Sequence, residues 1–135
     1  MNFKDIHIGE LIKKRVNECE IELSRICNFL QATPTEVELM FTEKSLNTEV
    51  LLRWSKLLKY DFFRIYSHHL ILYSPPTSNK QNKSNVLPHF HKNVYTKEII
   101  NFILEQIRNN IKTKQEVITE YNIPKATLYK WLEKY

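Results

Sequence analysis

Apolar residues in the first part of the chain recur every three or four positions, which is the spacing of amphipathic helices. Four stripes follow one another, and each predicts one helix: Ile8, Leu11, Ile12, Val16 and Cys19; Leu23, Ile26, Cys27 and Leu30; Val37, Met40 and Phe41; and Val50, Leu51, Trp54, Leu57 and Leu58. Thr33, Pro34 and Glu36 form a capping box before the third stripe, and Asn47 begins the fourth helix. The segment 61–73, DFFRIYSHHLILY, predicts a fifth helix, although its apolar pattern also fits a strand.

A second group of helical stripes begins after residue 93. Thr96 is suited to cap a helix over KEIINFILEQIRNN, whose apolar stripe consists of Ile100, Ile103, Leu104, Ile107 and Ile111. Thr113 and Glu116 form the capping box of the next helix, TKQEVITEYN. The closing segment PKATLYKWLEKY predicts a helix whose buried face consists of Leu128, Trp131, Leu132 and Tyr135. Three helices with a very short turn before the last one follow the helix-turn-helix plan, in which the last helix enters the DNA major groove.

Residues 74–93 are rich in proline, serine, asparagine and lysine and show no helical period, so they predict a flexible linker. The chain holds one glycine, Gly9, which disfavours hairpin turns and phosphate-cradling loops. The expected fold is therefore all-α, with two small helix-turn-helix modules at residues 1–73 and 94–135 joined by this linker.

Charge is distributed unevenly along the chain, whose formal net charge is +5. Residues 1–73 are neutral overall, residues 74–93 carry three lysines and no acid, and residues 94–135 have a net charge of +2. The basic excess of the middle and C-terminal parts is a modest electrostatic footprint for a polyanion such as DNA.

The segment EVITEYNIPKATLYKWLEKY resembles the helix-turn-helix of transposase and recombinase DNA-binding domains. The resemblance rests on the run TLYKW at residues 127–131 and on Ile123 at the apolar position of the turn. Asn122 stands where the family has glycine, and asparagine is the next-best residue at positive φ. The resemblance implies that the closing helix contacts DNA.

The N-terminal part, residues 6–66, resembles the Xre/Cro-like repressor domain, a five-helix fold. Ile26 and Cys27 stand where that family has leucine and alanine, QATPTEV stands at its helix-turn-helix, and LLRWSKLLKYD matches its fourth helix. Gln31 replaces the glycine of the turn. As a whole, the chain resembles short bacterial proteins of two modules that are described as transposases or helix-turn-helix regulators.

On the closing helix, burial of Leu128 and Trp131 turns a polar face outward. Lysine can reach a guanine edge or a phosphate, hydroxyl groups can donate to phosphate oxygens, and methyl groups can pack on a thymine methyl. The candidate DNA-binding residues are Lys114, Lys125, Ala126, Thr127, Tyr129, Lys130 and Lys134. The alternative is an ordinary amphipathic end helix with solvated lysines. The linker lysines Lys80, Lys83 and Lys92 either add phosphate contacts or are solvated linker charge.

The third helix of the first module presents a different face. With Val37, Met40 and Phe41 inside, its outward residues are acidic or neutral: Thr35, Glu36, Glu38, Leu39, Thr42 and Glu43. An acidic face is repelled by phosphates, so DNA contact is expected from the second module. Exposed Leu39 indicates either a protein interface or a single harmless surface leucine. Phe102 lies opposite the apolar stripe of its helix and indicates a second interface, either with the first module or with another chain. A homodimer is expected because operators are usually read by symmetric dimers.

Other classes of site are disfavoured. Cys19 and Cys27 are too few for a four-ligand metal site and are expected to be small buried residues. The paired histidines at 68–69 and 89–91 lack supporting cysteines or carboxylates, so we expect no metal, no cofactor and no small-molecule ligand.

A transposase catalytic core needs several carboxylates in a dedicated fold. Two small helical modules leave no room for such a fold, so we expect no catalytic residues. No segment is apolar enough for a membrane span or a secretory signal, and a cytoplasmic location is expected.

The sequence therefore favours a sequence-specific DNA-binding regulator. Two alternatives stay open. The chain could be a non-catalytic DNA-binding component of a mobile element, or a protein-interaction module in which the first module docks a partner.

Overall fold

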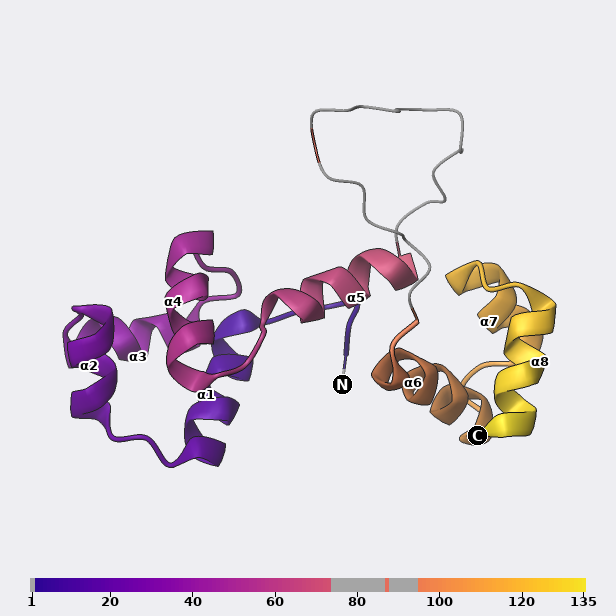
Figure 1. The fold of residues 1–135 in the computed structure, drawn as a ribbon, viewed down its shortest axis with the longest axis horizontal. Helices are drawn as coiled ribbons and strands as arrows, with labels where there is room; N and C mark the ends of the chain where they lie inside the picture. The colour runs from indigo at the N-terminus through magenta and orange to yellow at the C-terminus, as the bar shows by residue number, and fades with distance from the viewer. Residues whose placement is uncertain (1, 74–86, 88–94) are drawn as a thin grey trace. The chain divides into compact units, whose positions relative to one another are not determined.

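The computed structural model of the protein describes residues 2–73, 87 and 95–135 (Figure 1). Within these ranges it contains helices and no strand, so the all-α prediction is confirmed, and the segment over residues 63–73 is a helix. The helices are α1 Ile8–Cys19, α2 Leu23–Leu30, α3 Pro34–Thr42, α4 Thr48–Leu58, α5 Phe63–Tyr73, α6 Lys97–Arg108, α7 Lys114–Tyr121 and α8 Lys125–Lys134.

Backbone contacts divide the chain into an N-terminal unit, residues 2–66, and a C-terminal unit that comprises residues 67–135. The division falls within α5. The segment 74–93, which the sequence predicts to be a linker, lies outside the described residues except for Leu87, as do Lys80, Lys83 and Lys92. Each unit is described on its own below.

In the N-terminal unit, α1 packs on α3 and α4, and α2 packs on the same two helices. Most of the side chains that the helical stripes place inside are indeed buried: Ile8, Ile12, Ile26, Leu30, Val37, Leu51, Trp54, Leu57 and Leu58. Phe3, Phe62 and Ile65 add to this core from outside these stripes. Trp54 lies at its centre, where its Nε1 donates to Sδ of Met40 at 3.3 Å and its ring lies 5.9 Å from that of Phe41.

The start of α1 lies directly against the end of α3. The amides of Ile8 and Gly9 donate to the carbonyl oxygens of Lys44 and Glu43, each at 3.0 Å. A Cβ atom on Gly9 would lie 2.5 Å from the carbonyl oxygens of Met40 and Phe41. Only glycine lets the two backbones approach this closely, so the single glycine of the chain sits where the helix crossing requires it.

The threonine caps predicted before α3 and α7 are present at the expected residues. Thr33 Oγ1 accepts the amide of Glu36 at 3.2 Å, and Thr113 Oγ1 accepts the amide of Glu116 at 3.1 Å. At both caps the glutamate carboxylate accepts from the threonine hydroxyl, at 3.1 and 3.2 Å. Thr96 caps α6, as expected, by accepting the amide of Ile99.

Several helices end at a residue in the left-handed conformation that is not glycine. Gln31 has φ 54° and Asn122 has φ 52°, which confirms that both occupy turn positions where glycine would fit. Glu20 and Lys59, after α1 and α4, have φ values of 52° and 50°. A side chain in this conformation costs roughly 1–2 kcal/mol more than glycine, and asparagine tolerates it better than the others. These helix ends therefore carry strain that a glycine would relieve.

Lys59 and Lys56 offer a matched test of this strain. Lys59→Gly is expected to stabilise the N-terminal unit by about 0.5–1 kcal/mol, because glycine adopts positive φ without a Cβ penalty. Lys56→Gly, three residues earlier and exposed inside α4, is expected to destabilise the unit by about 1 kcal/mol through lost helix propensity. Urea unfolding of the two variants checks the opposite signs. Destabilisation by both substitutions would contradict the strain at Lys59.

The C-terminal unit is built around three helices, α6 to α8, each of which packs on the other two (Figure 1). Its buried apolar residues include Ile99, Ile100, Ile103, Leu104, Val117, Tyr121, Ile123, Leu128 and Trp131. Tyr121 donates its hydroxyl to Oε1 of buried Gln106 at 2.9 Å, which satisfies both polar groups and ties α7 to α6. Leu72 and His68 in the second half of α5 are also buried, and His68 Nε2 lies 3.2 Å from Thr96 Oγ1.

Several residues predicted to be buried lie at helix ends and are more exposed than expected. Cys19 is exposed and Cys27 is half-buried, so the prediction of two buried cysteines is wrong. Cys19 is the last residue of α1, whose buried residues lie in its first half. Leu23 begins α2 and is exposed, and Ile111 lies after the end of α6, where Asn110 turns the chain out of helical phase.

Candidate nucleic-acid interface

The candidate interface is formed by α7, the turn after it, and α8. Asn122 turns the chain out of α7 in the left-handed conformation, Ile123 is buried in the turn, and Pro124 occupies the N-cap position before α8. The turn between the two helices is therefore only three residues long, and its central apolar residue fixes it to the core. This arrangement holds α7 and α8 at a defined angle.

The inner face of α8 is anchored by large side chains. Leu128 is fully buried, Trp131 is buried, and the Trp131 ring meets the ring of Tyr95 edge-on at 5.0 Å. Burial raises the pKa of the Tyr95 hydroxyl. Leu132 is half-buried, but the prediction that Tyr135 is buried is wrong: it lies beyond α8 and is exposed, while its carbonyl oxygen accepts from Arg108 Nη2 at 2.6 Å.

The outer face of α8 carries the candidate DNA-binding residues. All are exposed except Thr127, which is half-buried: Lys125, Ala126, Tyr129, Lys130 and Lys134 from α8, and Lys114 from α7. The exposed polar face therefore lies where the helical period of the sequence puts it.

The structure brings three of these residues together although they come from two helices. Lys114 Nζ lies 5.3 Å from the centre of the Tyr129 ring, and Lys125 Nζ lies 5.6 Å from it. Both are within cation–π distance of the ring. We call Lys114, Lys125 and Tyr129 the basic cluster. Its two ammonium groups lie over the ring of an exposed tyrosine.

The lysines of the basic cluster have no carboxylate partner within the described part of the chain. Glu120 pairs with Lys112, and the carboxylate of Glu116 accepts from Thr113. Among the described residues, Lys114, Lys125 and Lys130 form no ion pair within 4.0 Å. Their positive charge is therefore available to an anionic ligand.

The corresponding helix of the N-terminal unit, α3, carries the opposite charge. Thr35, Glu38, Leu39 and Thr42 are exposed, as the sequence predicts. The first basic residue after this helix, Lys44, is paired with Asp5 at 3.2 Å. An acidic helix without free cations repels phosphate groups, so α3 is a poor candidate for contact with nucleic acid.

Phe102 does not lie on an outer face as the sequence predicts. It is half-buried, and its ring lies 6.3 Å from that of Tyr121 on α7. The buried arc of α6 is wider than the predicted stripe because Ile99 and Gln106 are buried as well. The apolar stripe alone could not show that α7 covers this side.

Sequence reasoning also missed Tyr73 and Tyr95, which contact the helices of the interface. The ring of Tyr73 lies 5.7 Å from that of Tyr121, and burial, reinforced by Tyr121, raises the pKa of the Tyr73 hydroxyl. Both tyrosines lie outside the helical stripes used for prediction, so no local signal marked them. They help hold α7 and α8 in place.

The described part of the chain lacks the features of two other classes of site. It holds no group of three or more histidine, cysteine, aspartate or glutamate side chains placed to bind a metal ion. Its helices all fall short of the length and hydrophobicity that a bilayer-spanning helix requires.

The chain was also compared with known proteins. No protein-family model, no curated protein and no solved structure matches it.

Proposed function

We propose that the protein is a sequence-specific DNA-binding protein, of the kind that regulates transcription in the bacterial cytoplasm, and that α8 reads the major groove. The observation that carries the proposal is the convergence of Lys114 and Lys125, from two helices, on Tyr129. This basic cluster stands at the start of a helix whose opposite face is anchored by Leu128 and Trp131. A rigid helix with cations at one end suits docking against a duplex.

The residues divide into two roles by their chemistry. Lys114 and Lys125 bind phosphates as point charges, and the Tyr129 hydroxyl donates to a phosphate oxygen. The start of α8 favours the same anion, because Pro124 has no side-chain group that could cap the first amides. The phosphate contacts thus set the position of α8 on the duplex.

Residues farther along the outer face of α8 contact the bases. Lys130 is exposed and one helical turn beyond Ala126, so it can donate to guanine O6 and N7 while Ala126 packs on a thymine methyl. Thr127 contributes either a hydroxyl donor or a methyl contact, and Lys134 extends the contact to the next phosphate. Regulators of this kind usually bind symmetric operators as dimers, so two copies of the protein are expected on each site.

A lysine-replacement experiment tests the proposal. The triple variant Lys114→Ala, Lys125→Ala, Lys130→Ala is expected to weaken binding to a random duplex library by about a hundredfold at low salt, and to lower the dependence of log K on log salt by about 2–3 units. The matched control replaces Lys13, Lys14 and Lys56, which are exposed in the N-terminal unit, and removes the same charge. Fluorescence anisotropy over a salt series measures both.

Selection experiments separate the two roles. Lys130→Ala is expected to relax the preferred base at one position of the selected sites, whereas Lys114→Ala is expected to weaken all sites equally. Equal losses in the triple variant and its control would contradict the assignment to α7 and α8. Absence of binding by the unmodified chain at low salt would contradict the proposal as a whole.

A further inference from the structure

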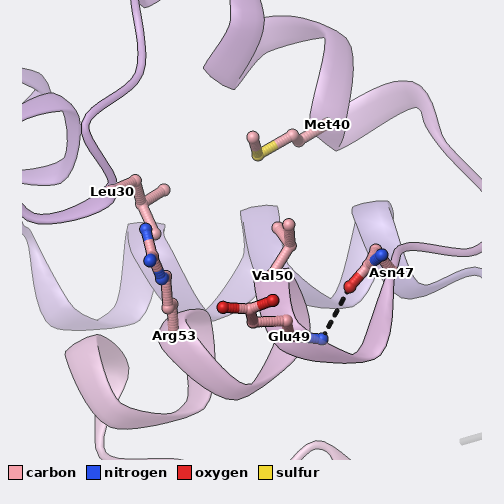
Figure 2. A pocket seen from close by; sticks show the side chains of 6 residues that line it. All are labelled: Leu30, Met40, Asn47, Glu49, Val50 and Arg53. Atoms are coloured by element: carbon pink, nitrogen blue, oxygen red, sulfur yellow. Dashed lines mark hydrogen bonds between the residues drawn. The ribbon is translucent and has the colours of Figure 1, made fainter.

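A pocket opens on the N-terminal unit where the end of α2 and the end of α3 face the first turns of α4 (Figure 2). Its volume is about 300 Å³, which lies at the lower end of the range for small-molecule sites. Six residues line it: Leu30, Met40, Asn47, Glu49, Val50 and Arg53. No local pattern in the sequence predicts this site, because its residues meet only when three helices pack.

One part of the lining is apolar and held by the core. Leu30 of α2 is buried, and Met40 of α3 and Val50 of α4 are half-buried (Figure 2). Met40 Sδ accepts from Nε1 of Trp54, which is fully buried. The apolar wall is therefore preformed, and in a pocket of this size it suits one aliphatic side chain.

The other part of the lining carries one negative and one positive charge. Glu49 and Arg53 are four residues apart on α4, so they lie one helical turn apart on the same face (Figure 2). Both are exposed, and neither forms an ion pair within 4.0 Å in the part of the chain that the structure describes. Both charges are therefore available to a ligand in the pocket.

We propose that this pocket binds a free α-amino acid with an aliphatic side chain, such as leucine. The α-carbon of this molecule carries an ammonium group, a carboxylate and an apolar group, which are the three chemistries of the lining. Glu49 accepts from the ammonium group, and the forked guanidinium of Arg53 donates two hydrogen bonds to the carboxylate. The aliphatic side chain lies against Leu30, Met40 and Val50.

The pairing of charges selects this ligand among molecules that carry an apolar group. A fatty acid would leave Glu49 without a cation, and an aliphatic amine would leave Arg53 without an anion. An internal segment of a peptide carries neither charge at its α-carbons. A free amino acid satisfies both side chains at once, so it is the occupant that the lining fits best.

Blocked analogues of leucine test this assignment on the full-length chain. Titration with L-leucine, followed by ¹⁵N NMR, is expected to shift the Trp54 indole signal, because its hydrogen-bond acceptor Met40 lines the pocket. The Trp131 indole signal should stay unchanged. N-acetyl-leucine lacks the ammonium group and leucinamide lacks the carboxylate, so each is expected to bind about tenfold more weakly. Alanine should also bind about tenfold more weakly, since it has fewer carbons to place on the apolar wall.

Charge-neutralising variants assign each contact to one side chain. Glu49→Gln is expected to weaken leucine about tenfold without weakening N-acetyl-leucine, and Arg53→Gln is expected to weaken leucine about tenfold without weakening leucinamide. The matched controls are Glu20→Gln and Lys56→Gln, at exposed residues outside the lining, and each should change the affinity less than about twofold. An unchanged Trp54 signal before leucine is added verifies that each variant is folded.

Three outcomes would overturn the proposal. The first is an unchanged Trp54 signal up to the solubility limit of leucine. The second is equal binding of leucine and its two blocked analogues, and the third is an equal loss in the lining variants and their controls. Each measurement is made without DNA, so its result is independent of the function proposed for α8.

Discussion

Replacing Gly9 with alanine is expected to destabilise the N-terminal unit by about 3 kcal/mol, despite the gain of about 1 kcal/mol that alanine brings to a helix. The added Cβ would lie 2.5 Å from two backbone carbonyl oxygens of α3 and 2.7 Å from a third. A backbone carbonyl cannot rotate away as a side chain can, so α1 must move off α3. That movement breaks the hydrogen bonds from Ile8 and Gly9 to the end of α3.

The two tryptophans allow this effect to be assigned to one unit, because Trp54 lies in the N-terminal unit and Trp131 in the C-terminal unit. Urea unfolding of Gly9→Ala, followed through the two indole NMR signals, should show an earlier transition at Trp54 and an unchanged one at Trp131. Asn17→Ala, at an exposed position of the same helix, serves as the control and should stabilise the unit by a few tenths of a kcal/mol, about the propensity difference. An unchanged Trp54 transition in Gly9→Ala would show that the close approach is not required.

Leu128→Ala is expected to destabilise the C-terminal unit by about 3 kcal/mol. Leu128 is fully buried on the inner face of α8, so alanine loses the transfer free energy of the removed methyl groups and leaves a cavity. Because this residue anchors α8, the variant should also lose the fixed presentation of the basic cluster, and its affinity for DNA should fall as the unit unfolds.

Leu132→Ala, four residues later, is the matched control. Leu132 is half-buried, so the same substitution should cost only about 1 kcal/mol. Thermal unfolding followed through the Trp131 indole signal measures both changes. If the two substitutions cost the same, Leu128 is not the principal anchor of α8.

The helices were predictable because their causes are local. Apolar spacing marks each inner face, and threonine at positions 33, 96 and 113 supplies the cap for the helix that follows. Positive φ at Gln31 and Asn122 was indicated by the two resemblances, in which glycine stands at these turn positions. The polar outer face of α8 followed from the same period, since burial of Leu128 and Trp131 determines which residues remain outside.

The predictions failed where burial depends on a neighbouring element. Cys19, Ile111 and Tyr135 continue an apolar period, but the chain leaves the helix there or no other element covers them, and they are exposed. Phe102 breaks the period, yet it is half-buried beside Tyr121. Periodicity describes one helix and contains no information about where the adjacent helix ends.

The sequence by itself determined the helical class of the protein, the start of most helices, and the contrast between an acidic α3 and a basic α8, because propensity, capping and charge act over a few residues. Only the tertiary structure decided which distant groups meet. It joins Lys114 to Tyr129, places Gly9 against three carbonyl oxygens, and assembles the pocket from three helices. These juxtapositions arise from helix packing, in which contacts link residues far apart in the chain, so no local pattern records them.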